Sequence, residues 1–335
     1  MVLRVVALGG GHGLAASLSA LRRVTPDVTA IVTVADDGGS SGRLRREFGV
    51  LPPGDLRMAL AALCGDDPWG ETWARAVQHR FGGSGELSGH ALGNLLLAGL
   101  WELLGDPVAG LDLLGRMLHV TGRVLPMAAV PLEIVACVSG LDPMSPDAKR
   151  EVRGQAAVAV TRGRVRSISL VPADPPAVPE AVAAVLGADW VVFGPGSWFT
   201  SVLPHLRVPS LAAALTQTTA RRLVALNLVP QPGETEGFSP HRHLEVLAEH
   251  APSLSLDVVL ADSGAVAGFE KELQKAAGLL HASLVLSDVA APDGARHDPG
   301  LLAAAYRDVF GGFRGVVPPG QQSGGLLMGV VPEWR

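Results

Sequence analysis

The order of apolar and polar positions predicts strands and helices in alternation from the first residues onward. Residues 2–8 form an apolar run that ends at a glycine. An amphipathic helix is expected next, with its apolar stripe at Leu14, Leu18 and Leu21. A second apolar run, rich in β-branched residues, covers positions 28–34. A strand, a glycine loop, a helix and a second strand in this order indicate a βαβ unit with parallel strands.

The pattern changes twice further along the chain. Apolar positions at helical spacing predict a mostly helical stretch over about residues 56–118. Residues 132–138, 156–160 and 165–171 then predict strands, with a hairpin turn at 161–164. Alternation returns afterwards, with strands expected at 190–193, 223–229, 256–260 and 284–286, and helices at 182–186, 244–250, 269–279 and 301–310.

Together these elements predict an α/β fold. We expect a Rossmann-like, mostly parallel sheet flanked by helices, with a helical region after the second strand and a small antiparallel insertion at about 122–172. No internal repeat or long linker divides the sequence. Residues 1–315 are therefore expected to form a single domain, followed by a tail over 316–335 that is rich in glycine and proline.

Composition narrows the classes of function. With 48% hydrophobic and 18% charged residues, the chain can bury a large core and is not a disordered protein. A formal net charge of −5 argues against a surface that coats nucleic acid. Cys64 and Cys137 form no metal-type pair, and neither a secretion signal nor a long apolar span is found. We therefore expect a cytoplasmic protein with no membrane span.

A glycine turn after the first predicted strand is the first candidate site. The pattern Gly11-x-Gly13-x-x-Ala16 fits the dinucleotide fingerprint in the expected strand-to-helix context. Backbone N–H groups in such a turn can approach a phosphate at a helix N-terminus. The alternative is a tight turn without a ligand, and His12 is either a phosphate donor or a solvated loop residue. The residues assigned to this site are Gly9, Gly10, Gly11, His12 and Gly13.

The second candidate is a loop of ligand-type groups after the second predicted strand. The adjacent carboxylates of Asp36 and Asp37 could hold Mg²⁺ or a sugar hydroxyl. The following residues could wrap an anion with hydroxyls, backbone N–H groups and a guanidinium. A capped surface turn is the alternative. The anion-binding residues proposed here are Ser40, Ser41, Gly42 and Arg43.

Two further motifs lie in the predicted helical region. Asp55 either caps the helix that follows it or supplies a third carboxylate facing Asp36 and Asp37. His90 and Asn94 are four residues apart, which predicts that they share one helix face. A ligand-binding pair and a purely structural pair are both compatible with that spacing.

The C-terminal half contributes three more polar groups. A second glycine-rich turn follows the strand at 190–193 and offers another anion site at a helix start. Because the carboxyl ends of parallel strands share one crevice, these loops together favour a nucleotide-diphosphate ligand. The residues assigned here are Gly194, Gly196, Ser197, Thr200 and Ser201 in that turn, Asn227, Glu234 and Thr235 in a later polar loop, and Arg296 before the last helix.

These motifs resemble the bacterial gluconeogenesis factor family (YvcK-like), which is related to 2-phospho-L-lactate transferase in the CofD-like superfamily. The string Asp-Asp-Gly-Gly-Ser-Ser-Gly-Arg-Leu at 36–44 is the most specific part of the resemblance. Similar segments extend over nearly the whole chain, at 9–14, 32–45, 52–57, 79–81, 87–97, 194–197, 200–204 and 233–237.

The resemblance implies a Rossmann-like fold that binds UDP-sugars, UDP-N-acetylglucosamine above all. It also implies a role in cell shape and wall synthesis during growth on gluconeogenic carbon sources, and regulation by a Ser/Thr kinase in some members. By position, the two glycine turns would hold the nucleotide and its phosphates. Asp36, Asp37 and Asp55 would face a transferable group or a metal, and Arg296 would contact the nucleotide-sugar.

Three functions follow from these observations. The first is a regulator that binds a nucleotide-sugar and acts on a cell-wall enzyme or answers to a Ser/Thr kinase, with a homodimer compatible with the apolar composition. The second is a Mg²⁺-dependent transferase that works on a nucleotide-diphosphate carrier through Asp36, Asp37, Asp55 and His90. The third, a nicotinamide dehydrogenase, fits the loop at 36–43 poorly.

Overall fold

The computed structural model describes residues 2–312, so the predicted tail at 316–335 lies outside the described residues. Its main sheet has seven parallel strands in the order β10-β9-β8-β7-β1-β2-β3. The strands are β1 (Arg4–Gly9), β2 (Asp27–Val32), β3 (Arg123–Pro126), β7 (Trp190–Phe193), β8 (Arg221–Ala225), β9 (Val258–Asp262) and β10 (Ser283–Ser287).

The central strands read as nearly continuous apolar runs because helices cover both faces of the sheet. Every residue of β7 and β9 is buried, as are five of the six residues of β1. β1 pairs in parallel with β2 on one side and with β7 on the other. The strand order therefore reverses between β1 and β7, and this reversal opens a crevice at the carboxyl ends of the two strands.

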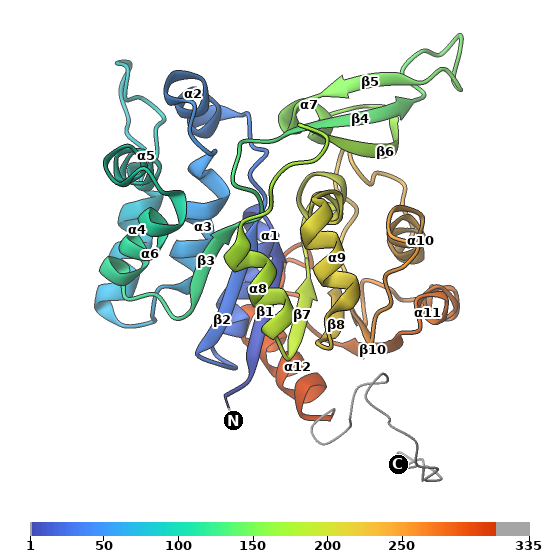
Figure 1. Cartoon of the computed structure of the whole chain (residues 1–335). Coiled ribbons are helices and arrows are strands. Elements are labelled where there is room, and N and C mark those ends of the chain that lie inside the picture. The colour runs from blue at the N-terminus through green and yellow to red at the C-terminus, as the bar shows by residue number, and fades with distance from the viewer. Residues whose placement is uncertain (1, 313–335) are drawn as a thin grey trace.

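Helices surround the sheet, and several of them begin at a proline in the first turn. Asp67 and Asp106 cap the starts of α4 and α6 with their carboxylates. Figure 1 shows α2–α6 gathered beside β3, and α10 and α11 at the opposite edge. The helices are α1 (Gly11–Leu21), α2 (Gly39–Phe48), α3 (Pro53–Leu63), α4 (Pro68–Gln78), α5 (Leu92–Leu104), α6 (Pro107–Leu118), α7 (Gln155–Ala159), α8 (Pro179–Gly187), α9 (Pro209–Gln217), α10 (Pro240–His250), α11 (Glu270–Leu279) and α12 (Pro299–Gly312), with a π-helical turn η1 (Trp198–Val202) and a 3-10 turn η2 (Leu203–Arg207).

A second, antiparallel sheet stands over the carboxyl end of the main sheet (Figure 1). It consists of β4 (Glu133–Ser139) between β5 (Arg150–Arg153) and β6 (Arg164–Val171). The predicted α/β class, the parallel sheet and the small antiparallel insertion are thus confirmed. None of the helices within residues 2–312 is long and apolar enough to cross a membrane.

The prediction of a strand at 156–160 is wrong, because this segment forms α7 and the strand precedes it as β5. Gly154 adopts φ 92°, which ends β5, and the Asp37 carboxylate accepts a hydrogen bond from the Ala156 N–H at 2.9 Å. That contact comes from a residue more than a hundred positions away. The local run of alanine and valine gives no hint of it and resembles a strand.

Candidate functional site

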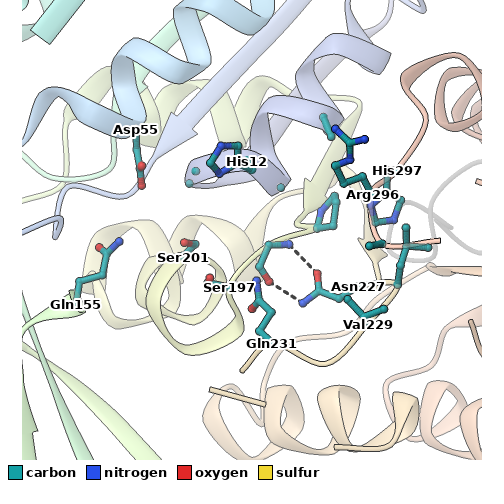
Figure 2. Close-up of a pocket in the computed structure, with 18 residues that line it drawn as sticks. His12, Asp55, Gln155, Ser197, Ser201, Asn227, Val229, Gln231, Arg296 and His297 are labelled. Carbon is teal, nitrogen blue, oxygen red and sulfur yellow. Dashed lines mark hydrogen bonds between the residues drawn. The ribbon is translucent and has the colours of Figure 1, made fainter. Parts of the chain in front are cut away.

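A cavity of about 410 Å³ lies where the loops after β1 and β7 meet (Figure 2). Loops after β8 and β10, the first turn of α3 and the start of α7 complete its wall. The carboxyl ends of the parallel strands therefore form one site, as the positions of the motifs predict. The lining residues are Gly10, Gly11, His12, Gly13, Ala16, Asp55, Gln155, Pro195, Gly196, Ser197, Ser201, Asn227, Leu228, Val229, Gln231, Ala295, Arg296 and His297.

The two glycine turns touch each other at the base of the cavity. Gly11 adopts φ 58°, a left-handed conformation that glycine adopts without strain. A side chain at Gly13 would collide with the carbonyl oxygen of Pro195 and with Gly196. Gly10, the N-cap residue of α1, has no side chain that could cap the helix. The Asp55 carboxyl group accepts a hydrogen bond from the Gly11 N–H, and the next N–H groups of the first turn are available to an anion.

Asn227 shapes the second glycine turn. Its Oδ1 accepts a hydrogen bond from the Gly196 N–H at 2.8 Å, and its Nδ2 donates to the Gly196 carbonyl at 2.9 Å (Figure 2). This pair fixes the turn against the loop after β8. Asn227 lines the cavity, but both polar atoms of its amide are already hydrogen-bonded to the backbone of the turn.

One end of the cavity is acidic. Asp55 lies in the first turn of α3, is 9% exposed and makes no cap, since the N-cap residue of that helix is Pro52. A Cβ at Gly10 would lie 2.5 Å from Asp55 Oδ2, so the carboxyl group faces the glycine turn. Burial and the neighbouring charge of Asp36 raise the pKa of Asp55 to about 7, against the lowering effects of the Gly11 N–H and Arg57.

Asp36 and Arg57 lie next to Asp55 but outside the cavity lining. A Cβ at Gly54 would lie 3.0 Å from Asp36 Oδ2, which places Asp36 beside the start of α3. Arg57 is 4% exposed, and burial, followed by the charge of Arg80, lowers its pKa while the two carboxylates oppose that shift. The buried Asp55, the half-buried Asp36 and the buried guanidinium of Arg57 thus compensate one another's charge.

The opposite end of the cavity carries Arg296 and His297, on the loop that follows β10 (Figure 2). Asp262, at the end of β9, accepts backbone hydrogen bonds from this loop, at Val289 (2.8 Å) and Ala290 (3.0 Å). Arg296 Nε donates to Asp293 at 2.7 Å. Its side chain is 82% exposed, which leaves the guanidinium accessible to an anionic ligand.

Several predicted residues lie outside the cavity in a separate buried cluster at the start of α2. Ser40 Oγ is 3.0 Å from His90 Nδ1 and accepts a hydrogen bond from Asn94 Nδ2 at 3.0 Å. The prediction that His90 and Asn94 share a helix face is wrong, because α5 begins at Leu92. The two side chains meet through Ser40 instead, and burial followed by the charge of Arg43 lowers the pKa of His90.

The rest of the loop after β2 is also engaged by the protein. Residues from Gly39 onward form α2 rather than a flexible loop. Ser41 Oγ accepts a hydrogen bond from the Gly54 N–H at 3.0 Å, and Arg43 Nη2 donates to the Ser88 carbonyl at 2.7 Å. Gly42 fits closely against the backbone of Asp37. These contacts hold α2 in place and leave Ser41, Gly42 and Arg43 outside the cavity lining.

Three more predicted residues, Thr200, Glu234 and Thr235, make hydrogen bonds within the protein and do not line the cavity. Glu234 is 4% exposed and accepts hydrogen bonds from the Phe199 N–H at 3.0 Å and from the Thr200 hydroxyl at 2.6 Å. Thr235 Oγ1 accepts a hydrogen bond from the Gln231 N–H at 2.8 Å. Glu234 therefore caps η1, whose Ser201 lines the cavity. Gly9 and Gly194, at the ends of β1 and β7, likewise fix the turns without lining it.

Asp36 and Asp37 do not form a paired site. Asp36 Oδ1 accepts a hydrogen bond from the Gly38 N–H at 2.9 Å, whereas Asp37 turns toward α7. Residues 2–312 contain no group of three or more His, Cys, Asp and Glu side chains that could hold a metal ion. Asp36 and Asp55 are the two carboxylates that approach each other at the cavity.

Eight lining residues are not among the residues that the sequence assigned to the site. Three of them, Ala16, Pro195 and Ala295, adjoin or belong to predicted motifs. Leu228 and Val229 continue the chain beyond Asn227 and supply the apolar part of the wall. His297 adjoins Arg296, so the Arg-His pair was the one available indication for it. Nothing in the sequence pointed to the glutamines, because their loops become neighbours only when the sheet folds. These two residues are Gln155 and Gln231.

Comparisons with known proteins show the family of this chain and relatives of its fold. The family described as 2-phospho-L-lactate transferase CofD matches residues 5–291. A Mycobacterium tuberculosis protein named putative gluconeogenesis factor is 60% identical over 307 residues, which are 91% of this chain and 90% of that protein. A Halalkalibacterium halodurans gluconeogenesis factor is 39% identical over 76% of each chain. A crystal structure of a Bacillus halodurans protein superposes with a TM-score of 0.79 at 33% identity, and covers 91% of this chain and 98% of its own.

Proposed function

This chain belongs to the CofD family and, within it, is similar to the gluconeogenesis factors; from that premise we propose that it is a regulatory protein that binds a nucleotide-sugar of the UDP-N-acetylglucosamine type. Its ligand state would link carbon metabolism to cell-wall synthesis and cell shape. The name that its relatives carry supports the metabolic half of this proposal. The half that concerns the cell wall rests on the resemblance of the sequence motifs.

The opposite chemical character of the two cavity ends is the observation that carries the proposal. The glycine turns and Arg296 offer backbone N–H groups and a cation, which suit a diphosphate. Asp55, beside the first glycine turn and far from Arg296, offers a carboxyl group, which suits hydroxyl groups. A nucleotide-sugar carries a diphosphate next to a sugar. It therefore presents anionic oxygens to one end of the cavity and neutral hydroxyl groups to the other.

Each part of the wall would then have a defined role in binding. The start of α1 and the Gly196–Ser197 turn would hold the phosphates, with Arg296 neutralising their charge. The apolar side chains of Leu228 and Val229 would contact the nucleoside. Asp55 would accept a hydrogen bond from a sugar hydroxyl when ionised, or donate its own proton when neutral, because its pKa lies near 7.

A Mg²⁺-dependent transferase is the second candidate, favoured by the proximity of Asp36 to Asp55. Mg²⁺ commonly binds one or two carboxylates together with substrate phosphates, and these two side chains fit that requirement better than Asp36 and Asp37. A bound Mg²⁺ would supply charge neutralisation of the transferred phosphoryl group. Asp36 and Asp55 would hold the ion, and Arg296 would steady the nucleotide at the far end.

Calorimetric titration with UDP-N-acetylglucosamine and Mg²⁺ tests the proposal, with GDP and NAD as controls and the ligand recovered afterwards. The expected result is a micromolar dissociation constant, about −8 kcal/mol, with the ligand recovered intact. Recovery of a converted ligand would establish the transferase instead. Binding of GDP or NAD without binding of any uridine nucleotide would refute the proposed ligand.

A variant test connects the cavity to the cell. A strain that lacks the protein is complemented with the wild type or with Arg296→Ala, and grown on gluconeogenic carbon sources. We expect Arg296→Ala to be stably expressed and to fail to restore growth and cell shape. Full complementation by a variant shown to have lost ligand binding would separate the cellular role from the cavity.

A further inference from the structure

Gln155 lines the cavity from the segment that connects β5 and β6 of the small antiparallel sheet. It is the first residue of α7, and its side chain lies on the same side of the cavity as Asp55 and away from Arg296 (Figure 2). Its Oε1 is buried without a hydrogen-bond partner among the described residues. The side-chain amide makes no hydrogen bond to any described residue, and leaving its buried oxygen unpaired is costly. Because the residue lines the cavity, rotation of the amide about its last side-chain bond would bring either polar atom toward a ligand group.

The position of Gln155 is set by Asp37. Asp37 Oδ1 accepts a hydrogen bond from the Ala156 N–H at 2.9 Å, one residue beyond Gln155. On the other side, the Gly154 N–H donates to the Ile134 carbonyl at 2.8 Å, and a side chain at Gly154 would collide with Asp37 Oδ2. Val158 anchors α7 with a fully buried side chain. The loop after β2 thus holds the inserted sheet against the cavity.

We propose that Gln155 is a specificity-determining residue whose amide recognises the sugar attached to the diphosphate, and that Asp37 is the positioning residue that holds it there. This assignment rests on the proposed function and deepens it. An amide can both accept from and donate to hydroxyl or acetamido groups. A nucleoside diphosphate without a sugar would leave the amide unpaired and would bring a terminal phosphate toward Asp55.

The chemistry of this end is unfavourable for direct binding of a phosphate without a metal ion. Asp36 and Asp55 are acidic, and the cation nearest to them, Arg57, is buried behind them. The accessible cation, Arg296, is at the opposite end (Figure 2). Gln155 therefore faces the part of a ligand that is neutral and rich in hydrogen-bonding groups, and it should discriminate between ligands with and without a sugar.

Calorimetry on the full chain with two probes, UDP and UDP-N-acetylglucosamine, tests the assignment. The quantity compared is the ratio of their dissociation constants. Gln155→Ala is expected to reduce the preference for the sugar nucleotide about tenfold, and to leave UDP binding within about twofold of wild type. Gln217→Ala is the matched control: it removes the same side chain from an exposed position outside the cavity and should leave the ratio unchanged.

Variants of Asp37 test the positioning role separately. Asp37→Ala is expected to lower the preference for the sugar nucleotide as Gln155→Ala does. Asp37→Asn keeps an oxygen acceptor for the Ala156 N–H and should restore most of that preference. Thermal unfolding of each variant verifies folding, and Gln155→Leu, which preserves volume, provides a second measurement if the alanine variant is unstable.

The outcomes separate this assignment from the proposed function. Wild-type protein that binds neither probe refutes the proposed function and the role of Gln155 with it. Wild-type protein that prefers the sugar nucleotide, with the preference intact in Gln155→Ala, leaves the proposed function standing and overturns the assignment. Equal wild-type affinity for the two probes overturns the assignment as well, because no sugar recognition would then remain for Gln155 to supply.

Discussion

Replacing Asp55 by asparagine should stabilise this protein, although Asp55 lines the candidate site. The carboxyl group is buried and lies beside Asp36, and these two effects raise its pKa from 3.8 to about 7. Ionised Asp55 is therefore unfavourable in the folded chain. Asparagine has nearly the same shape, keeps an oxygen that can accept from the Gly11 N–H and carries no charge.

The magnitude follows from the two pKa values. In the unfolded chain Asp55 ionises near pH 3.8, whereas in the folded protein it keeps its proton to about pH 7. Between these values the folded state binds more protons, so the free energy of unfolding falls as the pH rises. A difference of about three pKa units corresponds to about 4 kcal/mol once the pH exceeds 7, at about 1.4 kcal/mol per unit. We expect Asp55→Asn to recover about 2–4 kcal/mol of it at pH 8.5.

Urea denaturation of both proteins between pH 4 and pH 8.5 measures this effect. The advantage of Asp55→Asn should be close to zero at pH 4 and grow through the range up to pH 7. In thermal unfolding at pH 8.5, the melting temperature of Asp55→Asn should be higher than that of wild type by roughly 3–6 °C for a chain of this length. Asp174→Asn, at an exposed position, is the control for the loss of one carboxylate. A difference independent of pH, or a variant less stable than wild type at pH 8.5, would refute the reasoning.

Three further predictions concern the opposite end of the cavity and its supports. Arg296→Ala should weaken UDP binding about tenfold in calorimetry, because it removes the accessible cation. Asp262→Ala should lower the free energy of unfolding by about 2–4 kcal/mol at pH 7, since four backbone N–H groups lose their acceptor. Burial opposes ionisation of Asp262, but these donors hold its pKa below the ordinary value, so its contribution is present above pH 4 and is lost as the pH falls below it. Glu234→Ala should lower the free energy of unfolding by about 2–3 kcal/mol in urea denaturation, because the Phe199 N–H and the Thr200 hydroxyl at η1 lose their acceptor.

Conservative variants serve as controls for these three. Arg296→Lys keeps the charge and should retain part of the affinity for UDP. Asp262→Asn keeps one of the two acceptor oxygens and should lose less stability than the alanine variant. Unchanged UDP binding by Arg296→Ala would contradict a nucleotide at that end. Stability within about 0.5 kcal/mol of wild type for Asp262→Ala or Glu234→Ala would contradict the supporting roles described here.

Much of the fold could be predicted because its strands are buried on both faces. β7 matches the predicted segment 190–193, and the first glycine turn lies between β1 and α1 as expected. Where a tertiary contact decided the element, the prediction failed. β3 is a four-residue strand beyond the helical region, too short to stand out from its surroundings, and α7 depends on Asp37.

The predicted site divides in a similar way. Glycine turns that directly follow central strands line the cavity, because the turn and the crevice are both products of the strand order. Polar residues one step further away, such as Ser40, Glu234 and Thr235, have partners inside the protein. The sequence shows that a residue can bind an anion or a hydroxyl, but not whether another part of the chain already occupies it.

The sequence by itself determined the strand–turn–helix alternation, the two glycine turns and the family, since each of these depends on local spacing and on residue types within short segments. Tertiary structure alone decided that Asp55 lies beside Asp36 and not beside Asp37. It also decided that Gln155 reaches the cavity and that Arg296 lies far from Asp55. The physical reason is that side-chain direction, burial and pKa depend on neighbours brought together by folding. Those neighbours are separated along the chain by tens to hundreds of residues.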